Sequence, residues 1–324
     1  MISNSKLRSI AKCIRTNKNI LEKEEINPIV QYIESHSYKS ARIFSGIGED
    51  SAAVDNDNDM YTLVTTDRIK TAFVENFPFG AGFSSILVGV DDIYACGGTP
   101  TACSLIISFE DPEIGQKIIE GACEGSQKFK IPIVRGHTNT KNYYELSSTL
   151  IGEIKKKHYI SAKNANVGDY VIFAIDAEGQ IGEANKLYWN TTTFKSSEEV
   201  LRKRKSMNII AESCLATASK DISNGGIFGT VLQLIKYSGV GANININKII
   251  LPPKLIEHGY DLETYSKMFL TTSYLLTAEK ENCKKIIEIF NTYGMKAQVI
   301  GKIIKDTNLL RINNGKESLD VLKF

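Results

Sequence analysis

Four short acidic segments of this chain carry the residue types that hold a hard cation beside a phosphate group. They begin at residues 46, 65, 90 and 221, and they read GIGEDSAA, TTD, VDDI and DISNGG. Carboxylates at loop ends bind Mg2+, usually with phosphate as a further ligand. The glycines of the first and last segments let backbone N–H groups approach an anion closely. Together the segments predict a Mg-nucleotide site assembled from distant parts of the chain.

The first two segments support each other. Gly and Asp are ordinary turn residues, so residues 46–53 taken alone fit a simple turn better than a ligand site. The functional interpretation gains weight from Asp67, which directly follows a predicted strand rich in β-branched residues over Met60–Thr66. If the two loops lie close in space, they can share one or two Mg2+ ions that bridge phosphate oxygens.

Asp91 and Asp92 stand late in a predicted helix over Phe83–Cys96. A carboxylate near a helix C-terminus opposes the helix dipole, so this placement is unfavourable without a cation. Adjacent residues of a helix point to different sides, and we therefore expect one acid to face a site and the other to face water. We favour Asp92 as the ligand.

Two further polar segments have both a structural and a functional interpretation. Residues 221–226 precede a predicted helix beginning near Gly225, so they either cap that helix through Ser223 or Asn224, or bind an anion, or do both. The polar run 135–139 follows a short predicted strand over 131–134, and strand ends often contact ligands. His137 alone would more often be structural, but its place favours a role near a transferred phosphoryl group.

The alternation of apolar residues predicts an α/β chain in two parts. A basic, small-residue stretch over 155–166 indicates a boundary, giving domains 1–160 and 161–324. Residues 176–199 are expected to be irregular and to be the best candidates for acceptor specificity, although core packing explains Trp189 equally well. The remaining predicted strands cover 101–109, 146–154, 170–175, 242–246, 273–278 and 297–303, and the predicted helices cover 6–35 with a break at Pro28, 112–129, 199–217, 225–237 and 280–293.

Composition excludes several classes. The 324 residues carry a formal net charge of +2, which does not indicate binding to nucleic acid or to an anionic membrane. The basic runs 155–157 and 202–205 are expected to be solvated. No apolar stretch reaches the ~18 residues that span a bilayer, and the N-terminus lacks a signal core, so a cytoplasmic location is expected. The six cysteines form no CxxC pair, and no P-loop, Rossmann or protein-kinase motif is present.

The acidic segments, in this order and spacing, resemble those of the aminoimidazole ribonucleotide (AIR) synthetase-related superfamily. That superfamily includes AIR synthetase, formylglycinamide ribonucleotide amidotransferase, thiamine-monophosphate kinase, selenophosphate synthetase and a carbamoyl dehydratase of hydrogenase maturation. Residues 46–54 are similar to its Gly-x-Gly-Asp-Asp-Ala-Ala-Val loop, 65–67 to its Thr-Thr-Asp, 90–100 to its Ser-Asp-Ile-Ala-Ala-Met-Gly-Ala-x-Pro helix and 221–226 to its Asp-Ile-Ser-Asp-Gly-Leu. Residues 73–82, 132–139 and 220–223 look most like its AIR synthase-related and methanogenesis-marker group.

The resemblance implies an α/β (α+β) fold of two domains, with an N-terminal domain that dimerises through its sheet into a β-barrel and a C-terminal α/β domain. It implies a homodimer that holds ATP through Mg2+ in the cleft between the domains. Carried over by position, the metal ligands are Asp50, Asp67, Asp92 and Asp221, and the catalytic residues are Asp50, Asp67 and His137. The nucleotide contacts that we expect with them are Gly46, Gly48, Asp92, Arg135, Gly136, Thr138, Gly225 and Gly226.

Three departures from the superfamily pattern bear on function. Glu49 replaces the first acid of the loop, Arg135 replaces a glycine, and the Cys/Sec-Gly-Cys-Lys element of selenophosphate synthetase is missing, which argues against selenium chemistry. The leading hypothesis is Mg-ATP-dependent phosphoryl transfer to an oxygen of a small metabolite, either as a kinase or as activation before cyclisation, ligation or dehydration. The alternative is a nucleotide-binding accessory protein without chemistry of its own. The sequence does not identify the acceptor.

Overall fold

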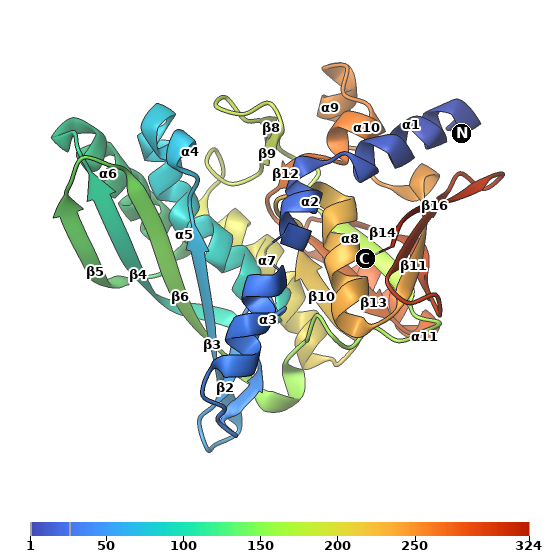
Figure 1. Ribbon diagram of the computed structural model, residues 1–324, viewed down its shortest axis with the longest axis horizontal. Coiled ribbons are helices and arrows are strands. Elements are labelled where there is room, and N and C mark those ends of the chain that lie inside the picture. Colours follow the sequence, from blue (N-terminus) through green and yellow to red (C-terminus); the bar gives the residue numbers. More distant parts are fainter. Residues whose placement is uncertain (1, 26, 324) are drawn as a thin grey trace.

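The computed structural model describes residues 2–25 and 27–323 and arranges them around two large β-sheets with helices packed on them (Figure 1). The first sheet has six strands in the order β1-β2-β3-β6-β4-β5. Its elements are β1 (Ile43–Ser45), β2 (Ala52–Asp55), β3 (Met60–Arg68), β4 (Thr99–Phe109), β5 (Ile133–Thr140) and β6 (Glu145–Lys155), with the helices α4 (Thr71–Asn76), α5 (Pro78–Ala95) and α6 (Pro112–Phe129).

The second sheet has seven strands in the order β10-β13-β7-β14-β11-β15-β16, and a small third sheet has the order β12-β9-β8. These strands are β7 (Tyr170–Ile175), β8 (Gln180–Ile181), β9 (Tyr188–Asn190), β10 (Ala218–Asp221), β11 (Gly241–Asn245), β12 (Phe269–Leu270), β13 (Ser273–Ala278), β14 (Lys296–Ile304), β15 (Leu309–Asn313) and β16 (Ser318–Lys323). The accompanying helices are α7 (Ser197–Glu212), α8 (Gly226–Ser238), α9 (Pro253–Glu257), α10 (Leu262–Tyr265) and α11 (Lys280–Thr292), with short 3-10 turns at Lys156–His158 and Ile246–Lys248. The expected two-part α/β organisation is confirmed.

The six-stranded sheet has one covered face and one more open face. Along β3, Tyr61, Leu63 and Thr65 are buried on the side that α5 packs against, because successive side chains of a strand alternate between faces. On the opposite face, Ile106 of β4 and Ile151 of β6 remain 45% and 40% exposed. The sheet therefore presents apolar side chains outward.

Among the described residues, α1 (Asn4–Arg15) contacts β15, β16 and α10 of the C-terminal half, and Ile20 of α2 (Lys18–Glu25) is buried in the same core. Leu7, Ile10 and Ile14 are buried in the core of the C-terminal half, and Arg15 donates from Nε to the backbone oxygen of Val321 at 2.7 Å. Figure 1 shows α1 over the C-terminal half of the molecule. The first helix of the chain therefore lies against the C-terminal half.

Several local expectations were wrong. Within the described residues, the stretch expected to be helical over 6–35 consists of three helices, because the chain is interrupted near residue 16 as well as beside Pro28, which lies in the first turn of α3 (Asn27–His36), where a missing N–H costs nothing. The polar run 135–139 is not a strand exit but the body of β5, and residues 176–199 include β8, β9 and the start of α7. Trp189 is fully buried and donates from Nε1 to the Asp176 backbone oxygen at 3.0 Å, so it belongs to the core.

The basic run 202–205 was also misjudged as solvated. Lys203 and Arg204 lie on the inner face of α7 and are 1% and 0% exposed, because each meets a buried carboxylate on a different part of the chain. Within the residues that the structure describes, no helix is long and apolar enough to cross a membrane.

Candidate functional site

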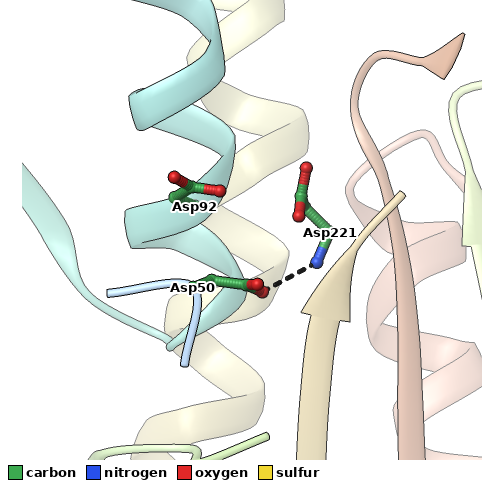
Figure 2. Close-up of side chains that lie close together, drawn as sticks. All are labelled: Asp50, Asp92 and Asp221. Atoms are coloured by element: carbon green, nitrogen blue, oxygen red, sulfur yellow. Dashed lines mark hydrogen bonds between the residues drawn. The ribbon is translucent and has the colours of Figure 1, made fainter. Parts of the chain in front are cut away.

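Three of the four predicted acidic ligands meet between the two halves of the molecule. Asp50 lies in the loop between β1 and β2, Asp92 in the last turns of α5, and Asp221 at the end of β10. One carboxylate oxygen from each of them lies within 4.8 Å of the other two. Figure 2 shows the three side chains converging from these elements. Three segments that are far apart in sequence therefore offer oxygen ligands to one point.

The Asp50 loop is fixed in place by a glycine and by Asp221. Gly48 has φ +97°, and a Cβ there would lie 2.8 Å from the ring of Tyr237 on α8, so a side chain would push the loop away. The Asp221 backbone N–H donates to Asp50 Oδ2 at 3.0 Å, the bond drawn in Figure 2. Lys220 Nζ forms an ion pair with Asp50 Oδ1. Asp50 is thus bonded on both oxygens by one strand of the other half.

Asp92 is held from the opposite side. Its Oδ2 accepts a hydrogen bond from Thr65 Oγ1 of β3 at 2.5 Å. Burial raises the pKa of Asp92 well above its ordinary value, and the neighbouring Asp67, Asp221 and Asp50 raise it further. Burial and Asp50 also raise the pKa of Asp221. Both shifts have the same cause, since acids that are gathered away from water repel one another.

Asp67 stands on β3, two residues beyond Thr65. Its Oδ2 is buried and has no hydrogen-bond partner among the described residues, and burial raises the pKa of this carboxyl too. A buried polar atom without a partner destabilises a fold and needs an explanation. Asp67, Asp50, Asp92 and Asp221 supply only oxygen donors, which is the chemistry Mg2+ prefers, and an ion there would neutralise the repelling acids. The residues present fit a magnesium site.

Asp91 differs from Asp92 in a way that the sequence did not indicate. It does not face water: it is 4% exposed, and Arg204 of α7 donates from Nε to its Oδ1 at 2.8 Å. The Thr272 backbone N–H also donates to it, at 3.3 Å. The two adjacent acids do point to different sides, as expected, but Asp91 joins the two halves through a buried ion pair.

Glu49 is likewise not part of the acidic cluster. Its carboxylate accepts hydrogen bonds from Ser45 Oγ at 2.5 Å, Ser161 Oγ at 2.6 Å and the Ala162 backbone N–H at 2.7 Å. These partners belong to the same loop and to the segment that joins the two halves. Glu49, which replaces the first acid of the family's loop, therefore connects the Asp50 loop to the segment between the two halves through hydrogen bonds.

Residues 225 and 226 begin α8 beside the cluster. Gly225 is the N-cap residue with φ +98° and makes no side-chain capping bond, so capping by Ser223 or Asn224, one of the two expectations, is not what the structure has. Gly226 has φ +64°, and a Cβ there would lie 2.0 Å from the backbone oxygen of Ser266. The Gly226 N–H donates to the Ser223 backbone oxygen at 3.0 Å, and the Gly225 N-cap supplies no side-chain bond to the N–H groups that follow it.

The predicted residues on β5 are not brought to the carboxylates within this chain. Arg135, Gly136, His137 and Thr138 are all exposed on an edge strand of the six-stranded sheet. Gly136 and Asp67 lie in one cross-strand row, but β4 and β6 separate them, which is about 14 Å at ~4.8 Å per strand. Arg135 and His137 pair with Ser104 and Ile106, so they share the open face of the sheet.

Gly46 lies in the Asp50 loop, where its carbonyl accepts a hydrogen bond from the Glu49 N–H at 3.0 Å.

Two lysines near the cluster were not singled out from the sequence. Lys220 directly precedes Asp221 in the chain. Its place within residues 220–223 was the only feature of the sequence that connected it with the site. Lys23 on α2 donates from Nζ to Gln233 Oε1 at 2.8 Å, and burial together with the charge of Lys220 lowers its pKa to about 8. Nothing in the local sequence distinguishes Lys23 from an ordinary surface lysine, because only the folding of α2 over α8 brings it here.

The fold and the cluster define a class of two-part α/β protein in which carboxylates from both halves meet between two sheets. Sequence comparison identifies the family. Residues 48–154 match the family described as AIR synthase related protein, N-terminal domain, and residues 176–310 match AIR synthase related protein, C-terminal domain. The chain therefore belongs to the AIR synthase-related family, as its motifs indicated.

Individual relatives agree with this assignment. An uncharacterised protein of Methanocaldococcus jannaschii is 34% identical over 322 residues, covering 98% of this chain and 97% of that one. The thiamine-monophosphate kinase of Buchnera aphidicola subsp. Schizaphis graminum is 24% identical over 323 residues, with 94% and 95% covered. The structure of T. maritima PurL complexed with ATP superposes with a TM-score of 0.72 at 14% identity; it covers 86% of this chain, which spans about half (47%) of that chain.

Proposed function

We propose that this protein catalyses Mg-ATP-dependent phosphoryl transfer to an oxygen atom of a small metabolite. The observation that carries the proposal is the convergence of Asp50, Asp92 and Asp221, whose carboxylate oxygens lie within 4.8 Å of one another, together with Asp67, whose buried Oδ2 has no hydrogen-bond partner among the described residues. Two relatives support it by what they bind or do: one is a thiamine-monophosphate kinase, and PurL of T. maritima is a protein complexed with ATP.

In this proposal the carboxylates hold Mg2+, which supplies charge neutralisation at the phosphate oxygens. The chain itself contributes orientation. The glycine loop around Gly48 and the uncapped start of α8 at Gly225 offer backbone N–H groups on two sides of the cluster, and Lys220 and Lys23 add positive charge. Fixed donors around a transferred phosphoryl group act mainly by positioning and electrostatics. Whether the phosphate remains on the product or leaves in a second step depends on the acceptor.

The active form in this proposal is a homodimer that pairs the open faces of two six-stranded sheets. Ile106 and Ile151 are 45% and 40% exposed there, and Val134 at the edge strand is 63% exposed. Pairing would cover these side chains and would place Arg135 and His137, which share this face, at the interface. Sedimentation of the wild type and of Ile151→Glu tests this; a monomeric wild type would contradict it.

The test of the proposed function is isothermal titration with ATP, with and without Mg2+. Wild type is expected to bind ATP only with Mg2+, whereas Asp50→Asn and Asp67→Asn each lose at least roughly 100-fold in affinity and in ATP turnover, because each removes a ligand charge. The matched control is Asp55→Asn, which removes a carboxylate from a half-buried pair with Lys156 on the same sheet. Retained Mg-dependent binding in Asp67→Asn would reject this site.

A second experiment distinguishes an enzyme from a nucleotide-binding accessory protein. The assay combines Mg-ATP with a panel of small phosphate-accepting metabolites and follows ADP release by coupled absorbance. The enzyme is expected to release ADP only when one acceptor is present. Tight Mg-ATP binding with no ADP release across the panel would favour the accessory protein.

A further inference from the structure

Asp50 differs from the other acids of the cluster because the chain itself satisfies both of its oxygens. Lys220 Nζ bonds Oδ1, and the Asp221 backbone N–H bonds Oδ2 at 3.0 Å. Both side chains of the ion pair are enclosed, with 6% of Lys220 and 5% of Asp50 exposed. Asp67, by contrast, has a buried oxygen for which the described part of the chain provides no hydrogen-bond partner. An ammonium group therefore occupies a position where a metal ion would otherwise bind Asp50.

The surroundings of Lys220 keep it at this position in the absence of ligand. Its Nζ lies 6.0 Å from the centre of the Tyr237 ring, and that ring also packs against Gly48 of the Asp50 loop. Lysine bears its charge on a flexible stem, so the ammonium can leave Asp50 without any movement of β10. A divalent ion arriving alone must displace this ammonium and would leave it buried without its partner, which is unfavourable.

We propose that Lys220 is an internal counter-ion that competes with a divalent cation for Asp50 and transfers to a phosphate group when the cation arrives together with a polyphosphate. A phosphate oxygen gives the displaced ammonium a new anionic partner, so the metal ion and the nucleotide bind as one unit. The protein would therefore hold a divalent cation weakly on its own and tightly with ADP or ATP. This inference rests on the proposed function, since it describes how that same site selects the metal–nucleotide complex over the bare metal.

The experiment measures Mn2+ binding by the loss of the free-ion electron paramagnetic resonance signal, with and without ADP. In Lys220→Met the affinity for Mn2+ alone is expected to rise at least tenfold over wild type, and the affinity for ADP in the presence of Mn2+ is expected to fall at least tenfold. Lys302→Met is the matched control: Lys302 also lies over a tyrosine ring, 5.4 Å from the centre of Tyr170, but it is exposed on the C-terminal sheet. Its removal is expected to change neither affinity.

Opposite changes in the two affinities are a readout that simple loss of structure would not give. Lys220→Arg, which keeps the charge, should retain weak binding of Mn2+ alone. Lys220→Gln carries the same expectation as the methionine variant and replaces it if that variant does not fold, with Mn2+-induced thermal stabilisation as a parallel measurement. Unchanged or weaker binding of Mn2+ alone in the neutral variants overturns the inference, as does wild type that binds Mn2+ equally well with and without ADP.

The two proposals can fail separately. If wild type binds Mn-ADP and the neutral variants gain no affinity for Mn2+ alone, the competing role of Lys220 is rejected and the nucleotide site stands. If the neutral variants gain affinity for Mn2+ but no form binds nucleotide, Lys220 does compete with the metal, whereas the transfer to phosphate and the proposed function both fail.

Discussion

Two groups of buried charge in this molecule invite comparison. The acidic cluster consists of Asp50, Asp67, Asp92 and Asp221. The lysine cluster consists of Asp176, Glu178, Lys195, Glu199 and Lys203. In the lysine cluster, Lys195 and Lys203 bond the two oxygens of Asp176 at 2.5 and 2.8 Å, and Glu178 and Glu199 lie within 3.6 Å of one or both lysines. Each lysine there has more than one carboxylate partner.

The difference supports the proposal that the acidic cluster, and not the lysine cluster, binds a ligand. Every charge of the lysine cluster is matched within the chain, as expected of an ion network that only supports a fold. In the acidic cluster, four carboxylates gather around one paired lysine, and burial raises the pKa of all four acids. One of their oxygens, Asp67 Oδ2, has no hydrogen-bond partner among the residues that the structure describes. Natural proteins retain such unfavourable arrangements mainly at functional sites. Three predictions test this contrast.

The largest effect is expected from Asp176→Asn. It removes the central charge between two buried ammonium groups, and breaking a buried ion pair from one side costs about 3–5 kcal/mol of unfolding free energy. Urea denaturation measures this loss. The control is Glu178→Gln, which touches the same Lys203 from an exposed position and should cost at most about 1 kcal/mol. Mg-ATP affinity should stay at the wild-type level in both, and a stable Asp176→Asn would remove the distinction between the clusters.

In the second prediction the substitution stabilises the metal-free protein instead of destabilising it. Asp92→Asn should raise the melting temperature of the metal-free protein, on the order of 2 °C for about 1 kcal/mol, because it relieves repulsion while its amide oxygen still accepts from Thr65. It should also abolish Mg-dependent nucleotide binding. The neighbouring Asp91→Asn is the control and should lower the melting temperature instead, since it leaves Arg204 buried without its carboxylate. Calorimetry measures the melting temperature of both variants. A shift of the same sign in the two variants would contradict the different roles assigned to Asp91 and Asp92.

The smallest effect concerns pH. Burial first, and neighbouring acids second, raise the pKa of Asp92 and Asp221 above the ~3.9 of an unfolded aspartate. The folded state then retains protons that the unfolded state has released, so the stability from these groups is complete below about pH 4 and is lost as the pH rises through the folded pKa values. Metal-free wild type should therefore lose stability relative to Asp92→Asn as the pH rises above about 4, and Mg2+ with ATP should reduce the loss. If the difference in stability between wild type and Asp92→Asn did not change with pH, this prediction would be wrong.

The sequence predicted much of this architecture because its signals were local. The long helices α5, α6 and α11 and the strands β3, β7 and β13 follow from apolar periodicity, β-branched composition and stop signals such as Gly97. The short strands β1, β2 and β10 were missed because three or four residues are too few to show an alternation, and β5 was cut short because most of its residues after Val134 are polar. Lys203 and Arg204 were misjudged for a related reason: their partners Asp176 and Asp91 are distant in sequence.

The sequence by itself determined the family, the two-part α/β organisation and the acidic residues available for chemistry, since motif order and periodicity are properties of the chain. Only the tertiary structure decided which carboxylates meet, that Asp91 joins the halves while Asp92 faces the cluster, and that Lys220 and Lys23 lie beside them. The physical reason is that burial and pairing of charge depend on distances between segments such as β10 and the Asp50 loop, and no local pattern encodes those distances.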